Sequence, residues 1–291
     1  MKLACFEHGN RIRVGLVAAD GASIQPIATP ENGGDPMIAV IAAQLAGGAP
    51  QPEGAALAMT EVRLRAPITR PSKNVLCVGK NYRAHAAEFT KSGYDSSARD
   101  ACDAVPEVPI VFTKAPCTMT GAHDAVVVPW ELTREIDYEG ELGVVIGRPG
   151  RAIRRGDAYD HVFGYTVIND VTARDLQARH KQWLLGKSID TFCPIGPWIV
   201  SAEELDPANL ELSCWVNGEL RQQANTRDLI FDIPTLVATL SASMTLETGD
   251  IIATGTPAGV GIGFDPPRFL TRGDVVRVAI SHVGAICNTI T

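Results

Sequence analysis

Short apolar runs of strand-like character recur along the chain after residue 108, and they constrain the fold more than any other feature. Many short strands with few helices between them are typical of a sandwich or a roll. Helical periodicity is found mainly in residues 171–183 and 232–242. The sequence therefore predicts an α+β, mainly β fold. The strand-like runs cover residues 109–114, 125–129, 139–147, 161–170, 195–201, 210–220, 250–257 and 273–281.

The first 70 residues have a different pattern and predict a small separate unit. Residues 1–6 and 12–18 are strand candidates joined by a turn. Asp35 as N-cap, followed by Pro36 at the first helical position, predicts a helix that continues to residue 46. Chemical groups are not concentrated in this region, so a structural role is preferred. We expect a small N-terminal α/β domain over residues 1–70 and a second domain over residues 71–291.

Composition excludes several classes of protein. The net charge of −7 and the lack of a Lys/Arg block argue against nucleic acid as a partner. The seven cysteines are scattered and form no C-x-x-C motif, which fits a reducing compartment. The chain has neither the apolar core of a signal peptide near its start nor an uncharged stretch of roughly 20 residues that could span a bilayer. We expect a cytoplasmic protein that binds neither nucleic acid nor membranes.

The segment EIDYEGELGVVIG, residues 135–147, places four acids at alternate positions: Glu135, Asp137, Glu139 and Glu141. Alternate side chains of a β-strand share one face, while the other face here is apolar. A row of like charges on one face is unfavourable unless something positive neutralises it. The pattern therefore indicates a cation near these carboxylates.

A second apolar run stops at Asn169-Asp170, and strand ends are where sheets present functional groups. If Asp170 converges with Glu139 and Glu141, the three carboxylates form a site for a hard cation, which suits Mg²⁺ or Mn²⁺. Spacing alone leaves a second interpretation open. In that interpretation the acids form the solvated face of an edge strand, and Asp170 caps the following helix.

Three further groups are candidates for chemistry. His85 and Glu88 stand three residues apart and face one side of a helical turn. A carboxylate that orients a histidine makes a general base for water, although an exposed pair without function has the same spacing. Lys187 lies in an apolar neighbourhood and is a candidate to balance the acids or to hold an anionic substrate. A surface lysine is the alternative interpretation.

The loop TGTPAGVG, residues 254–261, follows a strand and offers backbone N–H groups that suit a carboxylate, which we expect to be that of an anionic substrate. It lacks the Gly-Lys-Ser/Thr ending of a phosphate-binding loop, which argues against nucleotide binding. The chain has no G-x-S-x-G motif, so the interpretation as a serine triad fails. Residues 90–108 show no periodicity, which indicates either disorder or a mobile lid.

Six segments resemble the successive motifs of the fumarylacetoacetate hydrolase family, in the family's order, over about residues 71–291. The chain is similar to bacterial acylpyruvases and 2-hydroxyhepta-2,4-diene-1,7-dioate isomerases of that family, and its first 70 residues resemble their small extra domain. The resemblance implies the family's β-sandwich roll with a small N-terminal α/β appendage. The segments are VGKNYRAHAAE, DYEGELGVVIG, NDVTARDLQ, GKSIDTFCPIGPW, VNGELRQ and GDIIATGTPAGVG.

The resemblance also implies roles for residues that match the motifs. The implied ligands of a Mg²⁺ or Mn²⁺ ion are Glu139, Glu141 and Asp170. The implied catalytic residues are His85 and Glu88, as the dyad that activates water, and Lys187, near metal and substrate. The implied substrate contacts are Arg174, Gln177, Thr256 and Arg83, the last of which adds positive charge at the site entrance. Glu135 and Asp137 match no ligand position and are expected to face solvent or to support the ligands.

The implied activity is metal-dependent hydrolysis of a C–C bond in a 2,4-dioxo acid. The substrate would be an acylpyruvate such as fumarylpyruvate or maleylpyruvate, cleaved to release pyruvate in aromatic-compound catabolism by a homodimer. Oxaloacetate decarboxylation, and isomerisation or decarboxylation of hydroxymuconate-type diacids, use the same metal-enolate chemistry and remain alternatives. A non-enzymatic module that binds Ca²⁺ or an organic acid would need neither His85 nor Lys187.

Overall fold

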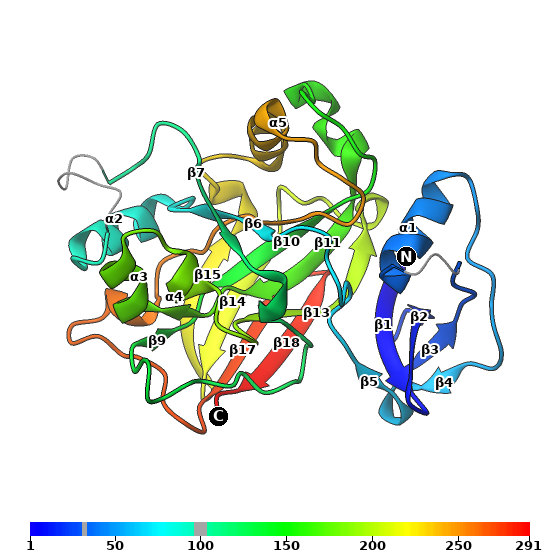
Figure 1. The fold of residues 1–291 in the computed structure, drawn as a ribbon, viewed down its shortest axis with the longest axis horizontal. Helices are drawn as coiled ribbons and strands as arrows, with labels where there is room; N and C mark the ends of the chain where they lie inside the picture. Colours follow the sequence, from blue (N-terminus) through cyan, green and yellow to red (C-terminus); the bar gives the residue numbers. More distant parts are fainter. Residues whose placement is uncertain (31–33, 96–103) are drawn as a thin grey trace.

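A large mixed sheet runs through the molecule, and its strands determine where the candidate residues lie (Figure 1). The structure is a computed structural model that describes residues 1–30, 34–95 and 104–291. In spatial order the strands are β4 (Leu57–Ala58), β3 (Ser23–Pro26), β2 (Arg11–Val17), β1 (Lys2–His8), β13 (Cys193–Ser201), β11 (Val162–Asn169), β10 (Gly140–Ile146), β16 (Ile251–Ala253), β6 (Val75–Gly79) and β7 (Ile110–Lys114), with β5 (Arg63–Leu64) on β1 and β8 (Met119–Thr120) on β13.

A second sheet packs against the large one through apolar side chains. Leu142 and Val144 of β10 belong to the same buried cluster as Leu212 and Val278 of the second sheet. Two sheets that share such a core form a sandwich, so the predicted mainly β fold is confirmed. The order of the second sheet is β15 (Glu219–Asn225), β14 (Glu211–Val216), β17 (Val275–Ile280) and β18 (Gly284–Thr289).

The N-terminal unit continues the large sheet, because β1 pairs with β13 in antiparallel register. Leu3 of β1 and Ile195 and Ile199 of β13 lie in one buried cluster. The predicted helix is present as α1 (Pro36–Leu45), and the Asp35 side chain accepts from two backbone N–H groups of its first turn. The division into domains at residue 70 stays a prediction.

Helices α2 (Arg83–Lys91), α3 (Arg174–His180) and α4 (Leu184–Lys187) lie at the end of the sheet remote from the N-terminal unit (Figure 1). The single helix predicted over residues 171–183 is wrong. The chain first forms β12 (Thr172–Ala173), which pairs with β9 (Ile136–Asp137), and Lys181, at φ = 58°, then separates α3 from α4. The other predicted helix is present as α5 (Ile233–Ser243).

Two further local differences concern the edges of the sheets. The run at residues 125–129 is not a strand, because Val126 makes only an isolated bridge to Ile290 and the Val127 side chain is exposed. Part of the predicted irregular segment, residues 90–108, belongs to α2, while residues 96–103 lie outside the described part of the chain. Within the described residues, no helix is long and apolar enough to cross a membrane.

Candidate functional site

Glu139, Glu141 and Asp170 meet where β10 begins and β11 ends. Gly140 pairs with Asn169 in the antiparallel register, and the Glu139 N–H donates to Asn169 Oδ1 at 3.0 Å. The Asp170 N–H in turn donates to the Glu139 carbonyl at 2.8 Å. Carboxylate oxygens of the three acids lie within 4.8 Å of one another, and all three side chains are buried. Backbone pairing thus holds three like charges together.

Buried cations compensate these charges. Lys187 Nζ donates to Glu139 Oε2 at 2.7 Å and to Asp170 Oδ2 at 2.8 Å. Lys114 Nζ lies 2.7 Å from Asp170 Oδ1. The Arg174 Nη2 donates to Glu139 Oε1 at 2.6 Å. Each of these contacts uses a different oxygen of Glu139 or Asp170, which offsets the cost of burying those two carboxylates.

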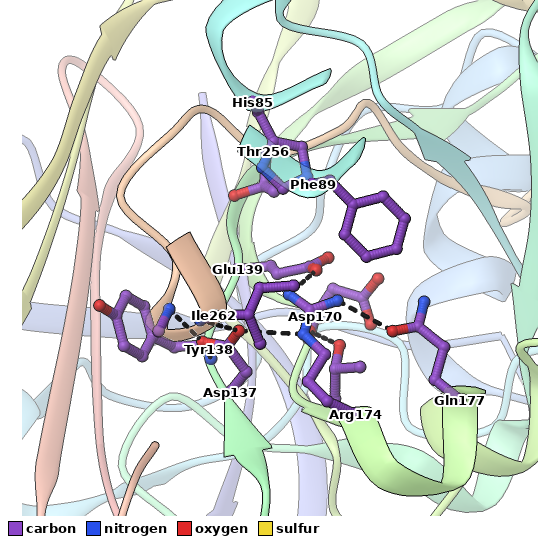
Figure 2. A network of polar contacts seen from close by, with 12 residues as sticks. His85, Phe89, Asp137, Tyr138, Glu139, Asp170, Arg174, Gln177, Thr256 and Ile262 are labelled. Atoms are coloured by element: carbon purple, nitrogen blue, oxygen red, sulfur yellow. Dashed lines mark hydrogen bonds and ion pairs between the residues drawn. The ribbon is translucent and has the colours of Figure 1, made fainter. Parts of the chain in front are cut away.

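Asp137 extends this group and does not face solvent. Its side chain is fully buried and accepts from Arg174 Nε at 2.9 Å, from the Gly261 N–H at 2.6 Å and from the Ile262 N–H at 3.1 Å. Figure 2 shows Arg174 between Asp137 and Glu139. Glu135, partly buried, accepts from the Tyr94 hydroxyl at 2.8 Å. We call Asp137, Glu139, Glu141 and Asp170 the acid cluster.

Two members of the acid cluster have opposite pKa shifts. Burial alone would raise the pKa of Glu139, but Lys187 and Arg174 outweigh it, and the pKa lies well below its ordinary range. Burial, together with the carboxylates of Asp170 and Glu139, raises the pKa of Glu141 well above its ordinary value. In the absence of a bound cation, Glu141 therefore holds a proton more readily than Glu139.

The acid cluster fits a divalent cation on its own chemistry. Glu141 Oε1 is buried and has no hydrogen-bond partner among the described residues, while its Oε2 accepts from the Gly255 N–H at 2.7 Å. An unpartnered buried carboxylate oxygen is costly unless something positive binds it. The converging ligands are all carboxylate oxygens, the set that Mg²⁺ and Mn²⁺ prefer.

The loop after β16 holds several of these acids through its backbone. The N–H groups of Gly255, Gly259 and Gly261 donate to Glu141, Glu88 and Asp137, at 2.7, 3.0 and 2.6 Å. Gly255 and Gly259 have φ values of +104° and +103°, a region that favours glycine.

The sequence predicts that this loop offers its N–H groups to a substrate carboxylate. For the three N–H groups of Gly255, Gly259 and Gly261 that prediction is wrong, because each is used by a carboxylate of the chain itself.

The predicted dyad forms on the first turns of α2. His85 Nδ1 lies 3.2 Å from Glu88 Oε2, and the His85 side chain is 5% exposed. Glu88 is fixed on its other side by the Gly259 N–H. A buried histidine paired with a held carboxylate is able to take and return a proton at the cavity.

One cavity brings most of the predicted residues together. His85, Glu139, Glu141, Arg174, Gln177, Lys187 and Thr256 line it, with an apolar wall of Phe89, Phe112 and Trp183. Figure 2 shows His85 and Thr256 on one side of Glu139, with Gln177 across from them. Glu88 and Asp170 do not line the cavity, but they pair with His85 and Lys187, which do. The roles given to these residues stay predictions.

Arg83 and Thr256 differ in position, because Thr256 lines the cavity and Arg83 does not. Arg83 opens α2 but is exposed, and it is not among the residues that line the cavity. The Thr256 hydroxyl donates to the Gly140 carbonyl at 3.0 Å and accepts from Gln222 Nε2 at 2.7 Å. Thr256 therefore connects the loop to the start of β10 through a hydrogen bond, independently of any contact with a ligand.

Sequence reasoning missed two lysines of the site. Lys114 ends the apolar run at residues 109–114 and is fully buried on Asp170, and Lys80, in the first motif, lines the cavity. A charged residue at the end of an otherwise apolar strand was the available signal for Lys114.

Comparison with known proteins gives consistent matches along the chain. The family described as fumarylacetoacetate (FAA) hydrolase, C-terminal, matches residues 74–291, and the family described as Rv2993c-like, N-terminal, matches residues 1–67. The oxaloacetate tautomerase YisK of Bacillus subtilis (strain 168) is 48% identical over 315 aligned positions, which cover 100% of both chains.

Two solved structures extend these matches. A fumarylacetoacetate hydrolase of the psychrophilic Exiguobacterium antarcticum superimposes with a TM-score of 0.84 at 40% identity, over 100% of this chain and 99% of that one. A maleylpyruvate hydrolase of Sphingobium sp. SYK-6, in complex with manganese(II) and pyruvate, superimposes with a TM-score of 0.75 at 35% identity, over 100% and 99%.

Proposed function

This chain belongs to the fumarylacetoacetate hydrolase family, and from that premise we propose that it is an oxaloacetate tautomerase that works with Mg²⁺ or Mn²⁺. The enzyme would interconvert the enol and keto forms of oxaloacetate, or of a closely related 2-oxo diacid. The full-length similarity to an oxaloacetate tautomerase supports this assignment. The homodimer expected for the family is part of the proposal, and sedimentation of the native protein tests it.

The observation that carries the proposal is a proton-transfer dyad at a cavity that is also lined by carboxylates and cations. His85 lines the same cavity as Lys187 and Arg174, so an acid bound by these cations would lie beside the dyad. Tautomerisation needs only that one proton leave C3 and one reach the oxygen on C2. The His85–Glu88 pair supplies a group able to do both.

The residues of the chain have distinct tasks in this reaction. His85 takes the proton as the C3–H bond breaks and the C2–C3 double bond forms, and it returns a proton in the reverse direction. Glu88 orients the imidazole and stabilises its charged form. Lys187, Arg174 and Gln177 lie on the cavity wall, where a substrate carboxylate would bind. A dication held by Glu139, Glu141 and Asp170 would supply Lewis acidity for the developing enolate.

Acylpyruvate hydrolysis is the second candidate function. It is favoured by the same dyad, because a held His–Glu pair is also able to activate water, and by the likeness to a maleylpyruvate hydrolase. Oxaloacetate decarboxylation remains a further variant of the same chemistry. The products separate the three reactions, since only tautomerisation leaves the carbon skeleton intact.

The test follows enol-oxaloacetate by its absorbance while pyruvate is measured in the same sample, with Mg²⁺ or Mn²⁺ present. We expect enol consumption without pyruvate, and a loss of kcat/KM of about 10²-fold or more in His85→Gln. His123→Gln, which changes an exposed histidine, is the matched control and should behave as wild type. Release of pyruvate from fumarylpyruvate or maleylpyruvate at a higher kcat/KM would favour hydrolysis instead.

A further inference from the structure

The charges at the acid cluster, with a bound dication, balance only one of the two carboxylates of a diacid. Its four carboxylates face three buried cations, Lys114, Arg174 and Lys187. A bound dication would then leave a net charge near +1, which balances the single carboxylate of a 2-oxo acid head. A substrate with a second carboxylate needs a further cation on the cavity wall.

Lys80 is a further cation on the cavity wall. It lines the same cavity as Glu139, Glu141 and Arg174, and its side chain is 1% exposed. Its partner lies outside the acid cluster, because Lys80 Nζ donates to Asp95 Oδ2 at 2.7 Å. The same Asp95 oxygen also accepts from the Thr90 hydroxyl at 2.7 Å. An ammonium has three donors, so this pair leaves Lys80 the capacity to bind a second anion.

The backbone places Lys80 beside the other cavity residues. β6 and β16 are parallel neighbours, so their carboxyl ends lie at one edge of the sheet, where ligands of such sheets bind. The chain after β6 carries Lys80 and then His85, while the chain after β16 carries Thr256. Lys80 has φ = 57°, an unfavourable conformation for a residue with a side chain, and such residues cluster at functional sites.

A purely structural role explains this pair poorly. Burying an ammonium and a carboxylate costs more desolvation energy than an apolar pair of similar volume, and the net gain in stability is small. The Lys80–Asp95 pair, with side chains 1% and 2% exposed, stands at the cavity wall and not in the sheet core.

We propose that Lys80 anchors the distal carboxylate of a dicarboxylate whose 2-oxo acid head binds at the acid cluster. Asp95 holds the ammonium in place when the cavity is empty and competes with the substrate for it. This inference rests on the proposed function for its substrate class, and it makes Lys80 the residue that distinguishes diacids from monoacids.

The test is a binding experiment and does not depend on turnover. The probes are malate and lactate, which share a 2-hydroxy acid head and differ in the distal carboxylate. Their dissociation constants are measured by calorimetry on the full chain loaded with Mn²⁺. We expect wild type to prefer malate by roughly tenfold to a hundredfold, as a charge-assisted hydrogen bond supplies. Lys80→Met should bring this ratio close to one, and Asp95→Asn should raise it.

Two controls keep the result unambiguous. Lys91→Met removes an exposed lysine of α2 and should leave the ratio unchanged. The double variant Lys80→Met/Asp95→Asn removes both charges of the pair, so it does not leave one of them buried without the other, and it should also lose the preference. A ratio near one in wild type, or a preference for malate that survives in the double variant, would overturn the inference. Absence of tautomerase activity would overturn the proposed function alone.

Discussion

The Lys187 ammonium donates to Glu139 Oε2 at 2.7 Å, so a lysine already neutralises a carboxylate assigned to the metal. It bridges to Asp170 Oδ2 at 2.8 Å and thus occupies two of the three acids at once. A dication bound by these oxygens must share them with the ammonium or displace it. Lys187 and the metal ion therefore compete for the same carboxylate oxygens, so removal of the lysine should change the affinity for the metal.

Lys187→Met should tighten Mn²⁺ binding while weakening the binding of anionic substrates. The variant removes a positive charge next to two ligands, and we expect the dissociation constant for Mn²⁺ to fall by about tenfold. Titration of Mn²⁺ in a calorimeter measures it, with Lys91→Met as the control for a surface lysine. Unchanged or weaker Mn²⁺ binding would show that Lys187 holds the ligands in place instead of competing for them.

Glu141→Gln should stabilise the metal-free protein at neutral pH. The pKa of Glu141 in the folded chain lies well above the ordinary value of 4.5. Its favourable contribution is therefore complete below about pH 4.5 and is lost as pH rises through the raised pKa. Glutamine stays neutral throughout, so in a chelator the variant should melt a few degrees above wild type at pH 8, and the gap should close toward pH 4.5.

Added Mn²⁺ should reverse that order, because only wild type retains the third carboxylate and gains stability by binding the ion. Thermal unfolding with chelator and with Mn²⁺, at both pH values, gives the four melting temperatures needed for each protein. Glu203→Gln, which changes an exposed glutamate, should shift none of them. If Glu141→Gln melted below wild type in chelator at pH 8, the raised pKa of Glu141 on which this prediction rests would be contradicted.

The sequence led to the three carboxylates because each stands at the end of a strand, where alternation and apolar runs are visible. It did not lead to Lys114, which reaches Asp170 only because β7 forms the edge strand beside β6. The order of strands in a sheet depends on contacts between distant segments, and local sequence patterns give little information about such contacts. Asp137 shows the same limit, since its partners Arg174 and Gly261 come from segments brought together by folding.

The glycine-rich sequence of the loop after β16 indicates backbone donors but not their acceptors. A glycine-rich turn signals available N–H groups, but it does not reveal which acid will reach them. In the structure the nearest acceptors are Glu141, Glu88 and Asp137, all fixed before any ligand binds. Residue types were therefore predictable, while the pairing between segments was not.

Gly263→Ala should separate Glu88 from His85 without changing either residue. A Cβ at position 263 would lie 1.8 Å from Glu88 Oε1, so the carboxylate must move away from its partners. We expect a loss of about 10²-fold in kcat with Mn²⁺ affinity retained, because the acid cluster is not touched. Gly156→Ala is the matched control, since a Cβ there meets nothing within 4 Å. Full activity in Gly263→Ala would mean that Glu88 has no part in proton transfer.

Leu3→Ala tests whether the N-terminal unit unfolds independently of the remainder. Leu3 is fully buried and shares a cluster with Ile195 and Ile199 of β13, across the β1–β13 pairing. Truncating such a leucine costs about 2–5 kcal/mol. If the shared core couples the two parts, urea unfolding should shift to lower denaturant as one transition, seen alike by tryptophan fluorescence and circular dichroism. Ile12→Ala, at a side chain that is 47% exposed, should shift it little. A second transition that appears only in Leu3→Ala would instead establish residues 1–70 as a unit with its own stability.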